Sequence, residues 1–236
     1  MSILEVKKLS VQYHTGHGRK KALDKISFSV GKGEIAGIVG ESGSGKSTVA
    51  KLLAGLAEAD EGEIFLDGKK ISCRKREQRK EIYRKMQMVF QSPAASFDPR
   101  RTLGDGIGES LRNAGISGKT LDERVKELLR SCGLSEEFVR RYPHEVSGGQ
   151  CQRAAIARAL AVNPKILICD EATSALDVMA QRQILELLAS LRETRGISIL
   201  FICHNPAVVE AFCDRFLVME QGRVIREEAI PTAAVP

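Results

Sequence analysis

Short runs of apolar residues, each about as long as one strand, recur along the chain and set its predicted elements. Those bounded by breakers or charged residues predict strands at residues 3–13, 26–30, 35–39, 62–68, 86–90, 166–169 and 198–203. A run that is apolar throughout, such as 166–169, fits a strand covered on both faces, as in a parallel sheet. The last two runs, 216–219 and 223–226, predict a hairpin around Gln221-Gly222.

Between residues 97 and 142 the pattern changes to the spacing of helices, and no strand pattern is visible. Apolar residues at helical intervals predict helices at 105–113 and 120–132, with glycine and proline breakers between and after them. We therefore predict a helical subdomain inserted between two strands of a sheet-containing core. Further helices are predicted at 46–53, 74–84, 153–161 and 178–194.

Composition places the chain among ordinary globular proteins, since 43% of its residues are hydrophobic and 28% are charged. A length of 236 residues suits one large α/β domain with a smaller inserted subdomain. No apolar run approaches the ~20 residues that span a bilayer, and the N-terminus lacks the layout of a signal peptide, so we expect a cytosolic chain. The net charge of +6 is dispersed except in 74–84, which favours a solvated basic face over a nucleic-acid site.

Cysteine and histidine residues are candidates for metal or redox chemistry. The six cysteines include no C-x-x-C pair, and we interpret all of them as reduced and mostly structural: Cys73, Cys132, Cys151, Cys169, Cys203 and Cys213. His14 and His17 share a basic loop predicted at 14–21 and could bind a transition metal. No cysteine or carboxylate accompanies them closely, so a loop without a metal is the favoured interpretation.

A glycine-rich loop with the pattern G-x-x-x-x-G-K-[ST] joins the strand at 35–39 to the helix at 46–53. Its glycines let main-chain N–H groups approach phosphates, and the helix start adds the positive end of its dipole. Lys46 is predicted to reach the β- and γ-phosphates, and the Ser47 hydroxyl to ligate Mg²⁺. The predicted nucleoside triphosphate site comprises Gly40, Glu41, Ser42, Gly43, Ser44, Gly45, Lys46, Ser47 and Thr48.

Two carboxylates follow the apolar strand at 166–169. Asp170 can hold Mg²⁺ through a water, and Glu171 can orient and deprotonate the attacking water of a hydrolysis. His204, at the end of the next predicted strand, can donate a hydrogen bond to the γ-phosphate, although such a histidine alone is more often structural. Tyr13, upstream of the phosphate loop, can stack on an adenine or pack on its own sheet.

Over nearly its whole length the chain resembles the ATP-binding subunits of ABC transporters. GESGSGKST matches the Walker A motif, and ILICDE at 166–171 matches Walker B with its catalytic glutamate. VSGGQ at 146–150 resembles the ABC signature, with Val146 where leucine is commoner.

The remaining family motifs are also present, in the family's order. SALD at 174–177 resembles the D-loop, and Gln91 matches the Q-loop glutamine. His204 matches the switch histidine and Tyr13 the adenine-stacking aromatic. The predicted helical insert lies between Gln91 and the signature, as the resemblance requires.

The resemblance implies an α/β fold: a P-loop NTPase core with a mostly parallel sheet, an N-terminal antiparallel β subdomain and an inserted α-helical subdomain. It implies a single ABC ATPase domain over 1–236. Within that domain, 1–91 and 162–236 are expected to form the nucleotide-binding core with the β subdomain. Residues 92–161 are expected to form the helical subdomain with the signature motif.

In this family two subunits pack head to tail and bind two ATP between them, each between the Walker motifs of one and the signature of the other. The resemblance thus implies that Asp177 lies at the interface and that four signature residues contact ATP across it: Ser147, Gly148, Gly149 and Gln150. It implies that the enzyme is an ATPase with ATP and Mg²⁺ as cofactors. The implied catalytic residues are Glu171, His204, Lys46 and Gln91, and the implied Mg²⁺ ligands are Ser47, Gln91 and Asp170.

Within the family, residues 87–109 and the run ARALAVNPKILICDEATSALDV resemble the peptide and nickel importers. This implies a second ATPase subunit in a heterodimer or, as the alternative, a homodimer. It also implies two transmembrane permease subunits, an external substrate-binding protein and a peripheral place on the cytoplasmic face of the membrane. Longer, peptide-type members carry a His-Pro-Tyr-Thr tail that this sequence lacks before Pro236. We therefore predict an importer of nickel, with a di- or oligopeptide importer as the alternative.

Two other functions are less favoured. A non-transport ABC ATPase acting on nucleic acid or the ribosome usually carries two cassettes, a long coiled coil or a zinc insert, and none is visible here. No nucleic-acid partner is therefore expected. A metal-binding or chaperone-like module built on His14 and His17 ranks last.

Overall fold

The computed structural model describes residues 1–15, 18–72 and 76–230 of the chain. By their internal contacts the residues form two compact units. The first comprises Met1–Met88, Lys165–Glu171 and Arg192–Pro236, and the second comprises Val89–Pro164 and Ala172–Leu191. The domain boundaries expected from the sequence stay a prediction.

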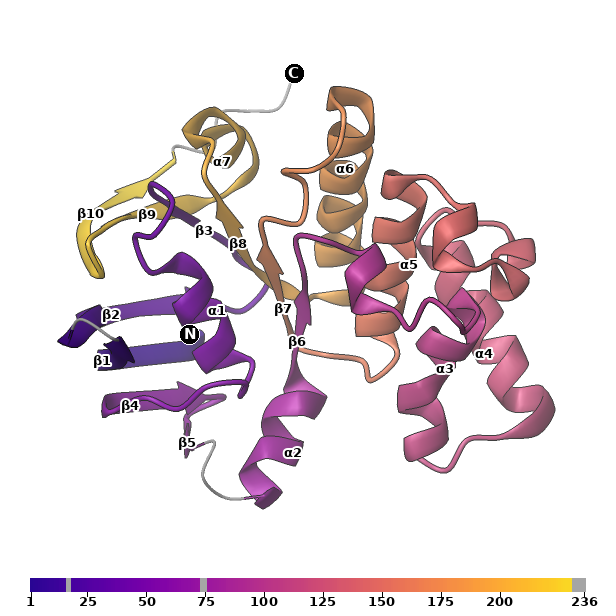
Figure 1. Cartoon of the computed structure of the whole chain (residues 1–236), viewed down its shortest axis with the longest axis horizontal. Helices are drawn as coiled ribbons and strands as arrows, with labels where there is room; N and C mark the ends of the chain where they lie inside the picture. The colour runs from indigo at the N-terminus through magenta and orange to yellow at the C-terminus, as the bar shows by residue number, and fades with distance from the viewer. Residues whose placement is uncertain (16–17, 73–75, 231–236) are drawn as a thin grey trace. The chain divides into compact units, whose positions relative to one another are not determined.

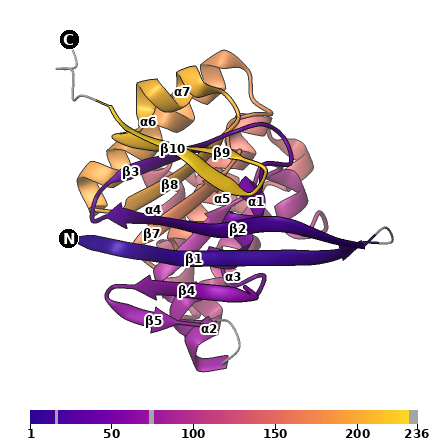
Figure 2. The same cartoon turned by 90° about the vertical axis from the view of Figure 1, so that its left-hand side faces the viewer.

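The N-terminal part of the first unit is a four-stranded antiparallel sheet in the order β2-β1-β4-β5. Its strands are β1 (Ser2–Thr15), β2 (Gly18–Gly31), β4 (Glu61–Leu66) and β5 (Lys69–Ile71). The turn between β4 and β5 has φ of 55° at Asp67 and 76° at Gly68, as a two-residue type I′ turn requires. Figure 2 shows the hairpin of β1 and β2 extending well beyond β4 and β5.

A second sheet has six strands in the order β10-β9-β3-β8-β7-β6. They are β3 (Ile35–Val39), β6 (Met86–Val89), β7 (Ile166–Asp170), β8 (Ser198–Cys203), β9 (Arg215–Glu220) and β10 (Arg223–Ala229). β3 pairs in parallel with β8 and β9, β7 pairs in parallel with β8, and β10 is antiparallel to β9. These parallel pairings confirm the mostly parallel sheet, and every residue of β3, β7 and β8 is buried, as expected for strands covered on both faces.

Helix α1 (Lys46–Leu53) joins the two sheets into one core. Its Val49, Ala50, Leu52 and Leu53 belong to the same buried cluster as side chains from strands of both sheets. Figure 1 shows α1 between the antiparallel sheet and strands β7 and β8. The phosphate loop at the start of α1 is therefore held by both sheets.

The outer helices of the first unit are α2 and α7. α2 (Arg76–Lys85) is highly charged and buries only Ile82. α7 (Pro206–Phe212) packs on β3, β8 and β9. Helix α7 was not predicted, although its signals are present in the sequence: Asn205 caps the helix by accepting the N–H of Ala207, and Pro206 occupies the first turn.

The second unit is helical, as predicted, and residues 97–142 contain no strand. Its helices are α3 (Leu103–Asn113), α4 (Gly118–Ser131), α5 (Gly148–Leu160) and most of α6 (Val178–Arg195), with 3₁₀ turns at Ala94–Ser96, Glu136–Arg140 and Pro143–Glu145. α3, α4 and α5 pack on one another, and their buried side chains include Ile107, Leu111 and Leu129. Within the described ranges, no helix has the length and apolar content needed to cross a membrane.

Two predicted boundaries differ most from the structure. The loop predicted at 14–21 is shorter, because β1 continues to Thr15 and β2 begins at Gly18. The helix predicted from residue 153 begins at Gly148, because Ser147 caps it by accepting the N–H of Gln150.

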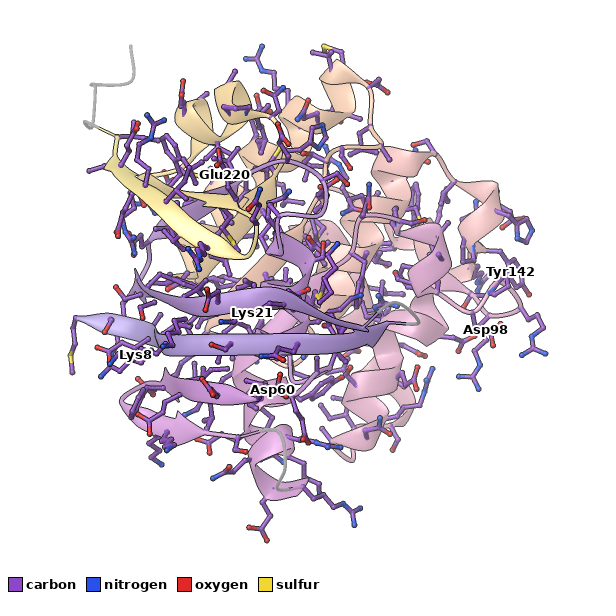
Figure 3. All side chains as sticks on the ribbon, turned by 60° about the vertical axis from the view of Figure 1, so that its left-hand side comes forward. Lys8, Lys21, Asp60, Asp98, Tyr142 and Glu220 are labelled. Carbon is purple, nitrogen blue, oxygen red and sulfur yellow. The ribbon has the colours of Figure 1, made fainter. Side chains whose placement is uncertain are left out.

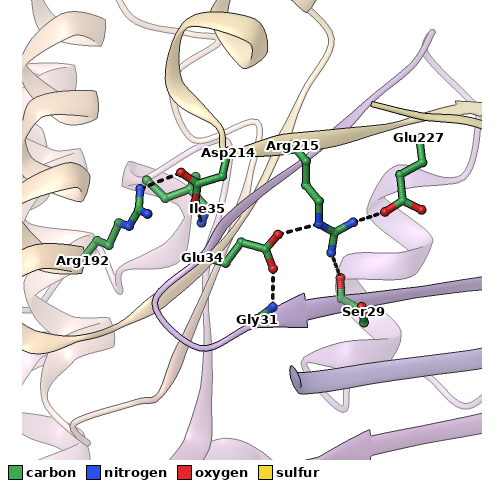
Figure 4. A network of polar contacts seen from close by, with 8 residues as sticks. All are labelled: Ser29, Gly31, Glu34, Ile35, Arg192, Asp214, Arg215 and Glu227. Atoms are coloured by element: carbon green, nitrogen blue, oxygen red, sulfur yellow. Dashed lines mark hydrogen bonds and ion pairs between the residues drawn. The ribbon is translucent and has the colours of Figure 1, made fainter. Parts of the chain in front are cut away.

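Arg215, at the start of β9, ties three strands of the first unit together (Figure 4). Its guanidinium donates to the Glu34 carboxylate, to the Glu227 carboxylate on β10 and to the carbonyl oxygen of Ser29 on β2. The other Glu34 oxygen accepts the N–H of Gly31. The arginine is largely buried, so these acceptors satisfy a charge that would otherwise be costly to enclose.

Phe201 of β8 provides a test of this core. It is fully buried, and its ring meets that of Phe212 edge to face with 5.1 Å between centroids. We expect Phe201→Ala to lower the free energy of unfolding by about 3–5 kcal/mol, because the substitution removes buried area and leaves a cavity. Urea unfolding followed by circular dichroism measures this. Ile225→Ala, at an exposed position, is the control and should change the free energy of unfolding by less than ~0.5 kcal/mol. Equal losses of stability in the two variants would contradict the placement of Phe201 in the core.

Candidate nucleotide site

The loop between β3 and α1 presents a helix start without a side-chain cap. α1 begins after Gly45, whose φ of 107° suits glycine and which has no side chain to cap the first turn. The first N–H groups of a helix lack partners within it, so such a start attracts an anion. This is the local structure that the glycine-rich pattern predicted.

Close packing of main chain around the loop explains its glycines. A Cβ on Gly40 would lie 2.2 Å from the carbonyl oxygen of Met219 and 2.8 Å from the Ser44 hydroxyl. A Cβ on Gly45 would lie 2.8 Å from the carbonyl oxygen of Ala22. Neither position can accept a side chain without moving the backbone of β9 or β2.

Lys46 is the buried cation of the loop. It is only 4% exposed, and its ammonium donates to the carbonyl oxygens of Gly40 at 2.6 Å and Glu41 at 2.7 Å. The Ser44 hydroxyl lies 3.5 Å from the same nitrogen. These acceptors keep the charge within the loop that is predicted to receive phosphates.

Ser47 and Asp170 bring two oxygens together. The Ser47 hydroxyl, in the first turn of α1, donates to Oδ1 of Asp170 at the end of β7 at 3.2 Å. Burial raises the pKa of the Asp170 carboxyl, the Ser47 hydrogen bond opposes that rise, and the neighbouring Glu171 charge adds to it. A hydroxyl and a carboxylate are the hard oxygen ligands that Mg²⁺ takes, with water and phosphate oxygens completing its shell. The residues present therefore fit a Mg²⁺ ion.

Glu171 directly follows β7 and faces His204. Its φ of 48° is unusual for a residue with a side chain, and its N–H donates to the carbonyl oxygen of Ile202 at 2.9 Å. Nδ1 of His204 lies 3.5 Å from Oε2 of Glu171. Strain of this kind costs of order 1–3 kcal/mol and is concentrated at functional sites. The structure thus places a carboxylate and an imidazole together at the ends of β7 and β8.

Tyr13 lies on β1, opposite Lys20 of β2, and is 44% exposed. This pair lies nearer to the hairpin tip than Ala22 does. The carbonyl oxygen of Ala22 adjoins Gly45 of the phosphate loop. Tyr13 therefore lies a short distance along the hairpin from the point where β2 contacts the phosphate loop. Its stacking on adenine stays a prediction.

Gln91 and the signature residues lie in the second unit. Nε2 of Gln91 donates to the Ser174 hydroxyl at 3.2 Å. The Ser147 hydroxyl accepts the N–H of Gln150, while Oε1 of Gln150 accepts the N–H of Ser147, and so the two residues form a capping box at α5.

Gly148 and Gly149 open α5 beside the residues that follow the D-loop. A Cβ on Gly149 would meet the Cβ of Ala180 at 3.1 Å. Asp177 caps α6 by accepting the N–H of Ala180 at 2.9 Å. The roles assigned to these residues at a dimer interface stay predictions.

One contact of the site was not predicted. The N–H of Gly222 donates to the carbonyl oxygen of Ser44 at 3.0 Å, so the turn between β9 and β10 supports the phosphate loop. The sequence signal was the Gln221-Gly222 turn itself, which predicts a hairpin but not its neighbour.

The remaining candidates are cysteines and histidines. Five buried cysteines are free thiols, in agreement with their interpretation as reduced: Cys132, Cys151, Cys169, Cys203 and Cys213. Their mostly structural role stays a prediction. Burial raises the pKa of the Cys169 thiol to about 12, so that thiol stays neutral. Cys73 and His17 lie outside the described residues, and the side chain of His14 is not described. Among the residues that the structure describes, no cluster of three or more histidine, cysteine and acidic side chains is placed to hold a metal.

Asp170→Asn should raise the thermal stability of the nucleotide-free protein at neutral pH, because burial disfavours the charged carboxylate. A folded-state pKa above the ordinary 3.8 means that the wild type loses stability as pH rises through that value and the folded-state pKa. The gain of the variant should therefore be absent at acid pH and complete at neutral pH.

Thermal melts across a pH series measure this difference. Asp98→Asn is the control, because the Arg100 guanidinium lowers the pKa of the Asp98 carboxyl and its removal should not stabilise the fold. A gain for Asp170→Asn that grew toward acid pH would contradict the burial argument.

Comparisons with known proteins identify the family of this chain. The family model "ABC transporter" matches residues 23–174. The chain is 45% identical over 226 residues to the oligopeptide transport ATP-binding protein OppF of Bacillus subtilis, covering 94% of this chain and 74% of that protein. Over 207 residues it is 48% identical to a putative peptide import ATP-binding protein of Brucella abortus, covering 87% of this chain and 62% of that protein.

Solved structures agree with the sequence comparison. The dimeric ATP-binding cassette MJ0796, in a post-hydrolysis state with ADP and Pi, matches with a TM-score of 0.88 and 32% identity over 98% of this chain and 100% of its own. cbiO1 of Clostridium perfringens, part of the ABC transporter complex cbiONQ, matches with a TM-score of 0.85 and 31% identity over 98% and 89%. The expected α/β P-loop NTPase fold is thus confirmed, and the chain belongs to the ABC transporter family as one of its ATP-binding proteins.

Proposed function

We propose that this chain is the ATP-hydrolysing subunit of an importer for di- or oligopeptides. The observation that carries the ATPase proposal is a set of two side-chain contacts that adjoin through the consecutive residues Asp170 and Glu171. Ser47 and Asp170 form the first pair, and Glu171 and His204 form the second.

The phosphate loop binds the triphosphate through main-chain N–H groups and the Lys46 ammonium. Ser47 and Asp170 hold Mg²⁺, which, when bound, neutralises charge on the β- and γ-phosphates. Tyr13 stacks on the adenine. Gln91 contributes to sensing the γ-phosphate and to the Mg²⁺ shell.

Glu171 is the general base of the proposed hydrolysis. It orients the attacking water and accepts a proton from it, while the water oxygen bonds to the γ-phosphorus. The bond from that phosphorus to the β–γ bridging oxygen breaks, and ADP leaves with the electron pair. His204, whose Nδ1 lies 3.5 Å from Glu171, orients the carboxylate and donates to the γ-phosphate through its other nitrogen.

A second ATPase subunit completes the proposed site. Ser147 caps the start of α5, and Gly148 and Gly149 add no side chain there, so their N–H groups suit a γ-phosphate offered from across a dimer. Asp177 then lies at the interface. The relative MJ0796 was solved as a dimer with ADP and Pi, which supports this arrangement.

Peptide cargo is favoured over nickel by the relatives reported above, which are named for oligopeptide transport and peptide import. The nickel prediction finds no support among them. The proposed complex places two cassettes, as a heterodimer, under two transmembrane permease subunits, with an external substrate-binding protein. This chain then acts from the cytoplasmic face of the membrane.

Glu171→Gln should retain ATP binding but lower turnover by on the order of 10²-fold or more, because the amide cannot accept the water proton. Phosphate release at saturating Mg²⁺-ATP measures turnover, and equilibrium binding measures affinity. Glu210→Gln, at an exposed position of α7, is the matched control and should hydrolyse ATP normally. Turnover near that of the control would exclude Glu171 as the base.

The cargo is tested by uptake in cells that carry Glu171→Gln and lack other peptide importers. We expect uptake of a labelled dipeptide to fall to background and uptake of labelled nickel to stay unchanged. Loss of nickel uptake with normal peptide uptake would restore the nickel alternative. If neither uptake changed, the transport role itself would be contradicted.

A further inference from the structure

The turn between β9 and β10 contacts two segments of the nucleotide site. The N–H of Gly222 donates to the carbonyl oxygen of Ser44 at 3.0 Å, and the carbonyl oxygen of Gly222 accepts the N–H of Asp24 at 2.8 Å. One residue of the C-terminal hairpin therefore joins the phosphate loop to β2. Figure 2 shows β10 running beside β2.

The same three segments are packed too closely for side chains. Gly222 has a φ of 79°, and a Cβ there would lie 2.6 Å from the carbonyl oxygen of Ala22. A Cβ on Gly45 would meet that oxygen at 2.8 Å. The Ala22 carbonyl thus lies against both the turn and the phosphate loop, and this fixes where β2 crosses the loop.

The Asp24 side chain adds a second link to this crossing. Its Oδ2 accepts from Nε and Nη2 of Arg223 at 2.9 and 2.6 Å, and its Oδ1 pairs with the Lys21 ammonium. Lys21 lies opposite Gln12 in the hairpin, and Gln12 precedes Tyr13. The contacts of Asp24 therefore extend from the C-terminal hairpin to the strand pair beside the aromatic residue.

The Asp60 carboxylate holds β1, the other strand of the hairpin. Oδ2 of Asp60 accepts the N–H of Gln12 at 2.6 Å, and the N–H of Asp60 donates to the carbonyl oxygen of Ser10 at 3.0 Å. Ser10 pairs with Glu61 at the end of the ladder between β1 and β4, so the Asp60 carboxylate continues that ladder toward Tyr13. Figure 3 shows Asp60 beside the antiparallel sheet that also carries Lys21.

We propose that Asp24 and Asp60 are positioning residues that hold the Tyr13 end of the β1–β2 hairpin in place relative to the phosphate loop, and so set the affinity for the base of ATP. The inference rests on the proposed function, in which Tyr13 stacks on adenine. The phosphates are bound by the loop itself. Removal of either carboxylate should therefore weaken binding of the base and leave binding of the triphosphate unchanged.

The test compares two ligands that differ in the base. Binding of Mg²⁺-ATP and of Mg²⁺-tripolyphosphate is measured by calorimetry for Asp24→Ala and Asp60→Ala in the full chain. We expect ATP to bind about three- to tenfold more weakly, with tripolyphosphate within about twofold of wild type. The KM for ATP should rise by the same factor, and kcat should stay unchanged.

Three comparisons separate positioning from a general structural role. Glu63→Ala removes a carboxylate that pairs with Lys70 elsewhere in the same sheet, and it should change neither ligand. The Asn variants of Asp24 and Asp60 keep an acceptor oxygen and should restore ATP affinity. In a Tyr13→Ala background the Ala variants should cause no further loss, because coupled residues are not additive.

Equal weakening of ATP and tripolyphosphate would overturn the inference, as would unchanged ATP affinity or an additive loss in the Tyr13→Ala background. Far-UV circular dichroism confirms that each variant is folded, and the Asp60 series gives an independent answer if Asp24→Ala does not fold. Failure of the proposed function would be distinguished by the wild type, which would then neither bind nor hydrolyse ATP.

Discussion

The structure of the nucleotide site depends on main-chain atoms packed against the phosphate loop from both sides. Gly40 lies against the carbonyl of Met219 in β9, and Gly45 lies against that of Ala22 in β2. A loop of this composition has many conformations when isolated, since glycine loses the most freedom on folding. Here neighbouring strands from both sheets restrict it to one, so the geometry of the phosphate cradle is a property of the whole first unit.

This arrangement permits charges that a core normally excludes. Lys46 is almost completely buried, and the carbonyl oxygens of Gly40 and Glu41 satisfy its ammonium. Asp170 is buried at the end of a strand whose other residues are apolar, and its raised pKa reflects the free-energy cost of ionising it there. The buried carboxylate is destabilising for the fold, but both groups are already oriented for a metal-bound triphosphate.

The sequence predicted the elements that carry strong, uninterrupted patterns. β3, α1 and β8 agree with their expected bounds because apolar runs of strand length and a glycine-loop-to-helix transition are local signals. Boundaries set by single hydrogen bonds were missed, as at α5, where the Ser147 side chain starts the helix before its apolar pattern begins. The β1–β2 hairpin was predicted too short because its polar tip pairs through the main chain, and side-chain type does not report such pairing.

Residues of the candidate site likewise fall into those that the sequence predicted and those that it did not. Lys46, Ser47, Asp170 and Glu171 could be predicted because the chemistry lies in their side chains and the motif fixes their spacing. Gly222 could not, because its contribution is one donated and one accepted main-chain hydrogen bond, and a turn glycine does not show in the sequence which segments lie beside it. The prediction of nickel failed to find support for a related reason: it was drawn from a missing tail, and cargo chemistry is not encoded in the residues that bind ATP. Side-chain motifs therefore identify the reaction, whereas the geometry that makes it selective has to be read from tertiary contacts.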